Sequence, residues 1–369
     1  LLGAGFMGAK TYPRALRAAA QIMGPMGVDV EVTHQYVRNP ANHADVAAVT
    51  HVPNITANVD EVIDATDVTF NCMPNDAHKV TKKALERGKH AGCEKPLADT
   101  LEVAEEIAGA ETDDTHTLVA TCYTGADAVA TGNDIVEDGG VLGDGETPWF
   151  SGRFNFLQDY RIGDDSNWRF KKDVAGPGGI LDDLVQHCLS IALMWLGAKA
   201  KLTHVRAELQ YAVGTGNDIT FFFGDEAKAK NYAVDGAVVT LYFEGGSTLI
   251  FESDRVSRGH KAFSLAELNG LNGSIRWELQ DGQWLDNFDY KAGGHNGWKR
   301  IHCSNEEQGN QLSVGGLTQG YETYFARIMV AFLMGIAQGT KTPEFDLGAG
   351  KKTHFIPGFQ FGLKLQRIT

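Results

Sequence analysis

The sequence predicts an α/β protein: an N-terminal doubly wound parallel (Rossmann) sheet, then an α+β domain with a large, mostly antiparallel, open-faced sheet. Three observations support this: a glycine-rich turn after the first apolar residues, strands alternating with helices to about residue 122, and strand-like segments separated by glycine turns beyond it. Strands that alternate with helices pair in parallel, whereas strands joined by tight turns pair antiparallel. A chain of 369 residues suits two domains, which we place at 1–122 and 123–369, with a final tail that can return to the first.

The composition is that of an ordinary globular protein, with 43% hydrophobic and 22% charged residues. The formal net charge of −14 disfavours binding to nucleic acid phosphates. The most apolar segment, 180–196, is interrupted by Asp182, Asp183 and His187, so we expect no membrane-spanning helix. The numbering begins inside the first expected strand and without Met, so we expect further residues before Leu1.

The five cysteines are widely spaced and form no CxxC pair, which indicates neither a zinc site nor a disulfide framework. We therefore expect a reducing compartment and a cytoplasmic protein without a bound metal. Cys72, Cys93 and Cys122 each end an apolar run, where a small buried residue is the simplest interpretation.

The glycine turn Gly3-Ala4-Gly5-Phe6-Met7-Gly8 stands between the strand Leu1-Leu2 and a helical pattern that continues to Met23. In a strand–GxGxxG–helix unit the first glycine permits the turn, the second admits a pyrophosphate, and the third allows close packing. The helix N-terminus then favours negative charge. The motif alone is a weak signal, but its position at the head of a βα series strengthens it. The sequence therefore predicts dinucleotide contacts at Gly3, Gly5, Phe6, Met7 and Gly8.

The segment 28–37 is expected to form the second strand, and it bears on the choice between NAD and NADP. An Asp or Glu that binds the ribose hydroxyls usually follows this strand, but here the chain reads Tyr36-Val37-Arg38-Asn39. Arg38 could hold a 2′-phosphate, or it could be a solvated loop residue. We leave both cofactors open, with a slight preference for NADP.

Two further strand ends carry polar residues. Segment 68–72 leads into Pro74-Asn75 and His78, and segment 89–93 leads into Glu94-Lys95-Pro96. Ligands of doubly wound sheets bind beyond the carboxyl ends of the strands, so these residues should lie near a dinucleotide, with Lys95 ending a central strand. Taken singly, Asn75 would be an ordinary helix cap and His78 a solvated residue of the first helical turn.

The second domain should contain a helix at 126–137, a late helix at 320–337 and a loop-rich excursion at 281–311. One apolar face of its sheet must be covered, which predicts a homodimer or homotetramer formed through this sheet. The expected strands are Trp149–Phe156, Leu202–Val213, Ala237–Phe243, Ser247–Ser257, Phe263–Asn269 and Ser274–Leu279.

The expected helix 180–196 carries the residues with the most informative chemistry. Asp183 and His187 are four residues apart, so they share one face, and the apolar side chains share the other. Alone, Asp183 would suit the helix dipole and His187 would be a buried core histidine. Together they indicate a carboxylate that orients an imidazole and raises its basicity.

Oxidation of a hydroxyl-bearing carbon requires a proton acceptor for the hydroxyl group, and a histidine that titrates near neutrality is suited to that role. The Lys95 ammonium would stabilise the developing alkoxide, or polarise the carbonyl in the reverse direction. A nicotinamide cofactor would perform the redox step. The sequence therefore predicts a dehydrogenase with Lys95, Asp183 and His187 as catalytic residues.

These segments resemble the glucose–fructose oxidoreductase/inositol dehydrogenase (Gfo/Idh/MocA) family over nearly the whole chain. The resemblance rests on the glycine turn, Pro74-Asn75 with His78, Cys93-Glu94-Lys95-Pro96-Leu97-Ala98, Gly178-Gly179 with Asp183 and His187, and Gly320-Tyr321-Glu322. Gln158-Asp159-Tyr160 and Trp168-Arg169 are similar to a sugar-dehydrogenase branch.

The resemblance implies NAD(P) and a sugar, cyclitol or related polyol as substrate. It implies that Lys95 orients and polarises the substrate oxygen, that His187 is the acid/base with Asp183 beside it, and that four residues lie along the nicotinamide half of the cofactor: Pro74, Asn75, His78 and Glu94. Expected substrate contacts are Lys95, Tyr123, Arg153, Gln158, Tyr160, Trp168, Arg169, Asp183 and His187.

The chain departs from the family pattern where many relatives carry Asn-Tyr-Arg and this sequence has Cys122-Tyr123-Thr124. The missing arginine could be replaced by Arg153, Arg161 or Arg169, and for Arg161 a surface ion pair is the favoured alternative. Two other functions stay open: glycoside cleavage by oxidation and elimination on NAD, and a non-catalytic dinucleotide-binding sensor. Retention of both Lys95 and His187 argues against the sensor.

Overall fold

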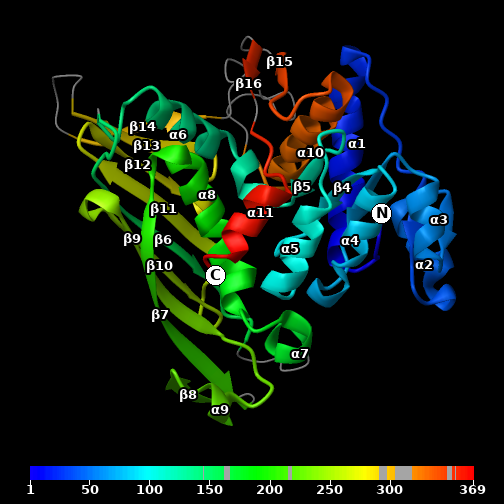
Figure 1. Ribbon diagram of the computed structural model, residues 1–369, viewed down its shortest axis with the longest axis horizontal. Helices are drawn as coiled ribbons and strands as arrows, with labels where there is room; N and C mark the ends of the chain where they lie inside the picture. Colours follow the sequence, from blue (N-terminus) through cyan, green and yellow to red (C-terminus); the bar gives the residue numbers. More distant parts are fainter. Residues whose placement is uncertain are drawn as a thin grey trace. The chain divides into compact units, whose positions relative to one another are not determined.

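The computed structural model confirms the predicted fold class (Figure 1). It describes residues 1–143, 145–161, 167–214, 218–290, 297–303, 318–346, 351–353 and 355–369. The chain divides into two compact units: the first contains Leu1–Gly125 and Gln319–Arg367, and the second contains Ala126–Asn305 and Ile368–Thr369. The first boundary lies close to the expected residue 122. However, residues 319–367, which include the late helix, belong to the first unit.

The first unit contains the parallel sheet. Leu2 pairs in parallel with Tyr36 on one side and Asn71 on the other, so it joins two groups of strands into one sheet. The resulting order β2-β1-Leu2-β3-β4-β5 is that of a doubly wound fold. All of these strands are parallel, and the order in which successive strands are added changes from one side of Leu2 to the other. The second strand is shorter than expected. The strands are β1 (His34–Tyr36), β2 (Asn54–Thr56), β3 (Val68–Asn71), β4 (His90–Cys93) and β5 (Thr117–Val119).

Helices surround this sheet. The aromatic ring of Tyr12, in the first long helix, lies 5.7 Å from the rings of both Phe70 and Phe325, so α1, β3 and α10 share one core. A second cluster forms around β4 and includes Ile107, Val119 and Phe359. The α-helices are α1 (Tyr12–Met23), α2 (His43–Thr50), α3 (Val59–Asp64), α4 (Val80–Glu86), α5 (Leu101–Gly109), α10 (Tyr321–Gln338) and α11 (Phe359–Gln366). Short helical turns are η1 (Met7–Thr11), η2 (Gly24–Met26), η3 (Pro40–Asn42), η4 (Asn75–Ala77) and η5 (Cys122–Gly125). Two further strands, β15 (Glu344–Asp346) and β16 (Lys351–Thr353), pair antiparallel.

The second unit is built on a sheet in the order β14-β13-β12-β11-β6-β10-β9-β7-β8. Every neighbouring pair is antiparallel except β6 and β10, which confirms the mostly antiparallel sheet. The strands are β6 (Phe150–Leu157), β7 (Leu202–Val213), β8 (Thr220–Phe223), β9 (Gly236–Phe243), β10 (Thr248–Asp254), β11 (Phe263–Gly270), β12 (Gly273–Glu278), β13 (Trp284–Asp289) and β14 (Lys299–His302).

The expected loop-rich excursion at 281–311 is wrong in its described part, which contains β13 and β14. Leu285 is fully buried and its neighbours Trp284 and Asp286 are partly exposed, an alternation that is typical of a strand with one covered face. Strand β8 (Thr220–Phe223) was not predicted from the sequence.

Figure 1 shows α6 and α8 on one face of this large sheet. The Phe154 ring contacts the Trp195 indole, and the Phe156 ring stacks on His187, which ties β6 to α8. On the opposite face, which we call the open face, apolar side chains such as Val238 and Ile250 stay 43% and 39% exposed. The helical segments are α6 (Asp127–Glu137), α7 (Lys172–Ala175), α8 (Gln186–Leu196), α9 (Glu226–Ala229), η6 (Trp168–Phe170), η7 (Leu181–Val185), η8 (Gly197–Lys199), η10 (Glu244–Gly246) and η11 (Leu279–Asp281).

All five cysteines are free thiols and all are buried, which confirms the interpretation of Cys72, Cys93 and Cys122 as small buried residues. Burial raises the pKa of the Cys188 thiol to about 12, so this group stays protonated at neutral pH. None of the described helices is both long and apolar enough to cross a membrane.

Candidate active site

The candidate functional residues fall into both units. In the first unit the glycine turn has the geometry that a dinucleotide requires. Gly3 has a φ of +103°, and a Cβ on Gly8 would lie 2.3 Å from the Gly3 carbonyl oxygen, so neither position tolerates a side chain. A Cβ on Gly5 would meet no atom within 4 Å, which leaves space beside the backbone for a pyrophosphate. Phe6 is largely exposed and Met7 partly so. These residues fit the cofactor that the sequence predicts.

Arg38 follows β1 on the surface of the first unit. It is exposed, and within the described part of the chain it makes no hydrogen bond or ion pair. The residue before it, Val37, is buried, and Asn39 caps the next turn by accepting a hydrogen bond from the Ala41 amide. The guanidinium is therefore available to a ligand, and no carboxylate stands beside it at the end of the strand.

His78 differs from the expectation. We predicted a cofactor contact, but its side chain is fully buried. Its Nδ1 lies 2.8 Å from the Pro96 carbonyl oxygen and its Nε2 lies 2.9 Å from that of Met73. Burial lowers the pKa of His78, and the two carbonyls oppose that change. His78 therefore connects the segment after β3 to the segment after β4.

Lys95 lies two residues beyond β4, which runs between β3 and β5, so the predicted placement at the end of a central strand is confirmed. Lys95 is partly exposed and the Lys95–Pro96 peptide bond is cis. The neighbouring Glu94 is buried, and its amide donates to the Asn71 carbonyl oxygen at 2.9 Å. Burial, with Glu94 as a nearby negative charge, raises the pKa of Tyr12, whose hydroxyl stays protonated.

Two more predicted residues of the first unit have little exposed surface. Asn75 is buried in the turn η4. Tyr123 is buried in η5, where its ring lies edge-on to Tyr324 with 6.3 Å between the ring centroids. Both lie beyond strand ends, as expected.

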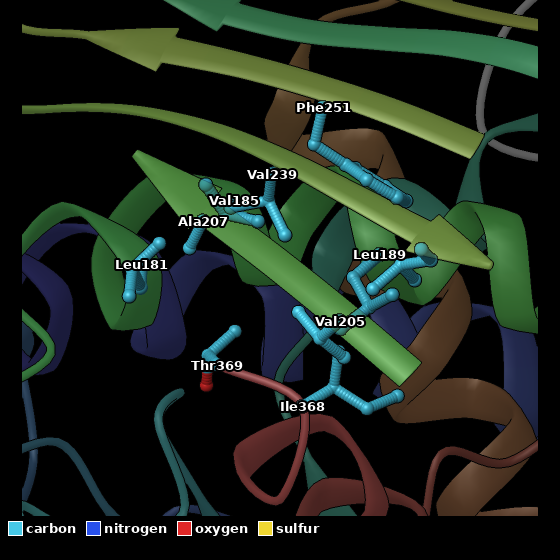
Figure 2. Close-up of a pocket in the computed structure, with 10 residues that line it drawn as sticks. Leu181, Val185, Leu189, Val205, Ala207, Val239, Phe251, Ile368 and Thr369 are labelled. Atoms are coloured by element: carbon cyan, nitrogen blue, oxygen red, sulfur yellow. The ribbon is translucent and has the colours of Figure 1, made fainter. Parts of the chain in front are cut away.

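In the second unit, Asp183 and His187 are partly exposed while the residues around them on the helix are buried. The helix begins as the π-type turn η7 and continues as α8. Its apolar side lines a small pocket, where Leu181, Val185 and Leu189 face strands β7, β9 and β10 (Figure 2). The remaining lining residues are Val205, Ala207, Val239, Leu241, Phe251, Ile368 and Thr369. Because this lining is almost wholly apolar, the pocket lacks the groups that would bind a polyol.

Asp183 is held by donors that the sequence analysis did not assign to it. Its Oδ2 accepts a hydrogen bond from the Tyr160 hydroxyl at 3.1 Å and one from Nη2 of Arg255 at 2.9 Å. Nε of Arg169 lies 3.5 Å from the same oxygen. Burial and the nearby carboxylate raise the pKa of Tyr160, so its hydroxyl keeps the proton that it donates. Asp183 is therefore a carboxylate among hydrogen-bond donors.

Arg255 belongs to a fully buried ionic network. Its Nη1 lies 3.3 Å from Oδ1 of Asp235, and the other oxygen of Asp235 lies 3.3 Å from Nε of Arg161. Both arginines and Asp235 have no exposed side-chain surface. Burial raises the pKa of Asp235, and the two guanidiniums oppose that rise. The surface ion pair favoured for Arg161 is therefore wrong, because this residue lies in the core.

The structure separates the remaining predicted substrate residues. Arg153 alternates with the buried Phe154 and Phe156 along β6, so it lies on the open face, away from His187. Arg153 was predicted to contact the substrate, and its position on the open face does not support that prediction. Arg169 stacks on the Trp168 ring at 4.5 Å and also approaches Asp183, so this pair remains near the helix. Gln158 follows β6, and its backbone amide donates a hydrogen bond to the Asp254 carbonyl oxygen.

Arg255 and Asp235 were missed, although strand periodicity offers a signal for the arginine. Phe251 and Ser253 face the covered side of the sheet, and Arg255 continues the same parity two residues on. A charged residue at a buried position requires an opposite charge. Within the described residues, no group of three or more His, Cys, Asp or Glu side chains could hold a metal ion.

The Rossmann unit, its glycine turn and the polar strand ends define a dinucleotide-dependent oxidoreductase. Residues 1–121 match the family model of the oxidoreductase family with an NAD-binding Rossmann fold, and residues 138–276 match the GFO/IDH/MocA C-terminal domain. The chain belongs to the Gfo/Idh/MocA oxidoreductase family.

The chain is similar in sequence to a curated dehydrogenase and in fold to solved structures. Levoglucosan dehydrogenase of Pseudarthrobacter phenanthrenivorans is 29% identical over 286 residues, which cover 74% of this chain and 72% of the relative. An oxidoreductase domain protein from Kribbella flavida is 25% identical with a TM-score of 0.83 over 100% of this chain and 93% of its own. The same fold occurs in a levoglucosan dehydrogenase complex with NADH and levoglucosan, at 24% identity, a TM-score of 0.83 and coverage of 100% and 93%.

Replacement of Arg255 tests the buried network. Arg255→Met leaves the Asp183 and Asp235 carboxylates without their shared cation, so we expect the free energy of unfolding to fall by about 3–5 kcal/mol. Arg255→Lys keeps the charge but not the planar fork, and should cost less. Urea denaturation measures both changes.

Arg87→Met is the matched control. Arg87 also contacts two carboxylates, those of Asp60 and Asp64, but its side chain is 35% exposed. Water screens an exposed ion pair, so we expect a much smaller loss from this variant than from Arg255→Met. An equal loss in the two variants would contradict the importance of the buried network.

Proposed function

We propose that the protein is an NAD(P)-dependent dehydrogenase of a sugar, cyclitol or related polyol. The observation that supports this most strongly is the pair Asp183 and His187. These residues form the partly exposed corner of a largely buried helix, and donors from three other positions approach one oxygen of the carboxylate. An ordinary core helix has no need of such an arrangement.

When bound, NAD(P) supplies the hydride acceptor or donor. In the oxidative direction His187 accepts the proton of the substrate hydroxyl, and in the reductive direction it returns that proton. Lys95 stabilises the negative charge on the same oxygen. Asp183 accepts a hydrogen bond from Arg255 and orients the groups at this end of the helix. Pro74, Asn75 and Glu94 line the nicotinamide half of the cofactor, and His78 positions them.

The substrate class is proposed from the relatives and from the polar residues near the helix. One relative is named for levoglucosan, and a solved inositol dehydrogenase homologue from Azotobacter vinelandii carries NADH and myo-inositol. Tyr160, Trp168 and Arg169 combine hydroxyl and guanidinium donors with an aromatic face, which suits a polyol. Gln158 and Tyr123 complete the proposed substrate contacts.

Single and double replacements of the proposed catalytic residues test this function. We expect Lys95→Ala and His187→Ala each to lower kcat by about 10²–10⁴-fold on a substrate found in a panel of sugars and cyclitols. If both residues act on one step, the double variant loses little more than the worse single variant. Absorbance of the reduced nicotinamide measures the rates.

Lys83→Ala, which removes a partly exposed lysine of α4, is the control and should keep full activity. Wild-type rates in Lys95→Ala or His187→Ala would refute the proposal. Release of an aryl group from a glycoside without net change in nicotinamide would instead indicate glycoside cleavage. Cofactor binding without turnover on the whole panel would indicate a sensor.

We also propose that Arg38 binds a 2′-phosphate, so that the enzyme accepts NADP in addition to NAD. Arg38 is exposed and makes no ion pair within the described residues, and the acid that would repel the phosphate is absent. Arg38→Ala should raise the KM for NADP by about tenfold, the loss expected for one charge-assisted contact, and leave the KM for NAD unchanged. Steady-state kinetics with each cofactor measure this, and equal changes in both values would contradict it.

The open face of the large sheet is proposed to bind a second copy of the chain. Five residues in register across five strands alternate in charge: Arg153, Glu267, Arg276, Asp286 and Arg300. Exposed Val238 and Ile250 lie beside this row. Exposed apolar side chains next to a row of polar residues are typical of a surface that binds another protein, and a two-fold axis brings the same patch of both copies together. We therefore infer a homodimer, or a tetramer built from such dimers.

Sedimentation analysis of Ile250→Glu tests the assembly. A carboxylate buried in an apolar contact is unfavourable, so we expect the variant to be a monomer at concentrations where the wild type is a dimer. Val49→Glu adds the same charge at an exposed valine of α2 and should keep the wild-type mass. A monomeric wild type, or an unchanged mass for Ile250→Glu, would contradict the proposed interface.

A further inference from the structure

We infer that Gln35 is a positioning residue for the dinucleotide, because its side chain fixes both ends of the glycine turn. Gln35 lies in β1, the strand next to Leu2, and has no exposed surface. Its Nε2 donates hydrogen bonds to the carbonyl oxygens of Gly3 and Gly8, both at 2.9 Å. These are the first and third glycines of the turn. The inference rests on dinucleotide binding by this family and does not depend on the proposed sugar substrate.

The Gly8 carbonyl needs this donor because of how the helix begins. In an α-helix the amide of Tyr12 would donate to the Gly8 oxygen. Here the first turn is a π-helix, and the Tyr12 amide donates to the Met7 oxygen instead. The next residue is Pro13, which has no N–H group. The backbone therefore leaves the Gly8 oxygen without its usual donors, and the Gln35 amide replaces them.

The Gly3 carbonyl lies at the other end of the turn. Gly3 adopts a positive φ of +103°, and its oxygen is the atom that a Cβ on residue 8 would approach to 2.3 Å. The two carbonyls therefore converge on one side-chain nitrogen, which contributes both of its hydrogens. The residues between them, including Gly5, are held at both ends. Because the turn must present its backbone to a pyrophosphate, this restraint lowers the cost of ordering the turn on binding.

The Gln35 amide can satisfy this role in one orientation only. Its Oε1 is buried and has no hydrogen-bond partner within the described residues, whereas Nε2 faces two carbonyl oxygens. A flipped amide would place an oxygen against two oxygens, so the network fixes the assignment. A glutamate at this position would create the same repulsion as long as its carboxyl group is ionised.

The test compares three variants by calorimetric titration with NADH in the absence of any sugar. Gln35→Met keeps the shape and removes the donors, and we expect NADH binding about tenfold weaker. Gln35→Glu should bind more weakly still at neutral pH and recover partly in acid, where a protonated carboxyl group can donate to one carbonyl. Pro13→Ala in the Gln35→Met background supplies a backbone N–H and should restore part of the affinity. At saturating nucleotide, kcat should change little.

Thr117→Val is the control for loss of stability alone. The Thr117 hydroxyl donates to Glu111 and accepts from the Phe359 amide, both at 2.9 Å, at the opposite end of the parallel strands. We expect this variant to lower the melting temperature and to keep wild-type affinity for NADH. The inference would be overturned if Gln35→Met lost stability, as Thr117→Val does, but still bound NADH as tightly as the wild type. A wild-type protein that binds neither NADH nor NADPH would refute it together with the cofactor assignment, whereas failure on every sugar would leave it standing.

Discussion

The buried contact between Arg255 and the two carboxylates Asp183 and Asp235 is the constraint on which the second unit depends. Removing guanidinium and carboxylate groups from water costs several kcal/mol per ion, and only close pairing with further hydrogen bonds offsets that cost. Here one guanidinium contacts the helix that begins at η7 through Asp183 and contacts the residue before β9 through Asp235. The partly exposed corner of the helix is thereby fixed to the sheet by charge, in addition to apolar packing. Shifting the helix would separate a buried ion pair.

In the first unit, neutral side chains form the hydrogen bonds that buried backbone groups need. Its irregular loops at the carboxyl ends of the strands contain buried carbonyl and amide groups that no strand partner satisfies, and each such group must find a hydrogen bond. Side chains of neighbouring segments supply these bonds. Gln35 donates to the glycine turn, the Asn71 side chain contacts the Met73 amide and the Ala77 carbonyl, and His78 joins the Met73 and Pro96 carbonyls. Buried side chains therefore hold the backbone that would contact a cofactor, and these side chains are themselves not exposed to solvent.

This arrangement explains which features the sequence could predict. The glycine turn, the loop after β4 and the pair Asp183 and His187 are local patterns, whose spacing places them on strand ends or on one helix face. The fold class follows from the same local periodicity. Arg255 meets Asp183 across 72 residues, and no local pattern specifies that contact.

The errors have the same origin. Arg161 was expected at the surface because its partner Asp235 is 74 residues away, and β13 was expected to be a loop because its alternation is short. For Arg255, however, and for Gln35 in β1, the sequence held a usable signal. A polar or charged residue at a position that strand parity buries must be satisfied, and the identity of its partner then requires the structure.

The contacts of Asp183 also decide how the proposed proton transfer is divided. Hydrogen bonds from a guanidinium and from a tyrosine hydroxyl, such as those that Asp183 accepts, favour the ionised form of a carboxylate. Burial keeps the Tyr160 hydroxyl protonated, so the tyrosine cannot serve as a base at neutral pH either. An ordinary imidazole changes its charge in the physiological pH range, whereas an ordinary carboxylate does not. Of the two residues on this helix face, His187 is therefore the one to which we assign the proposed proton transfer.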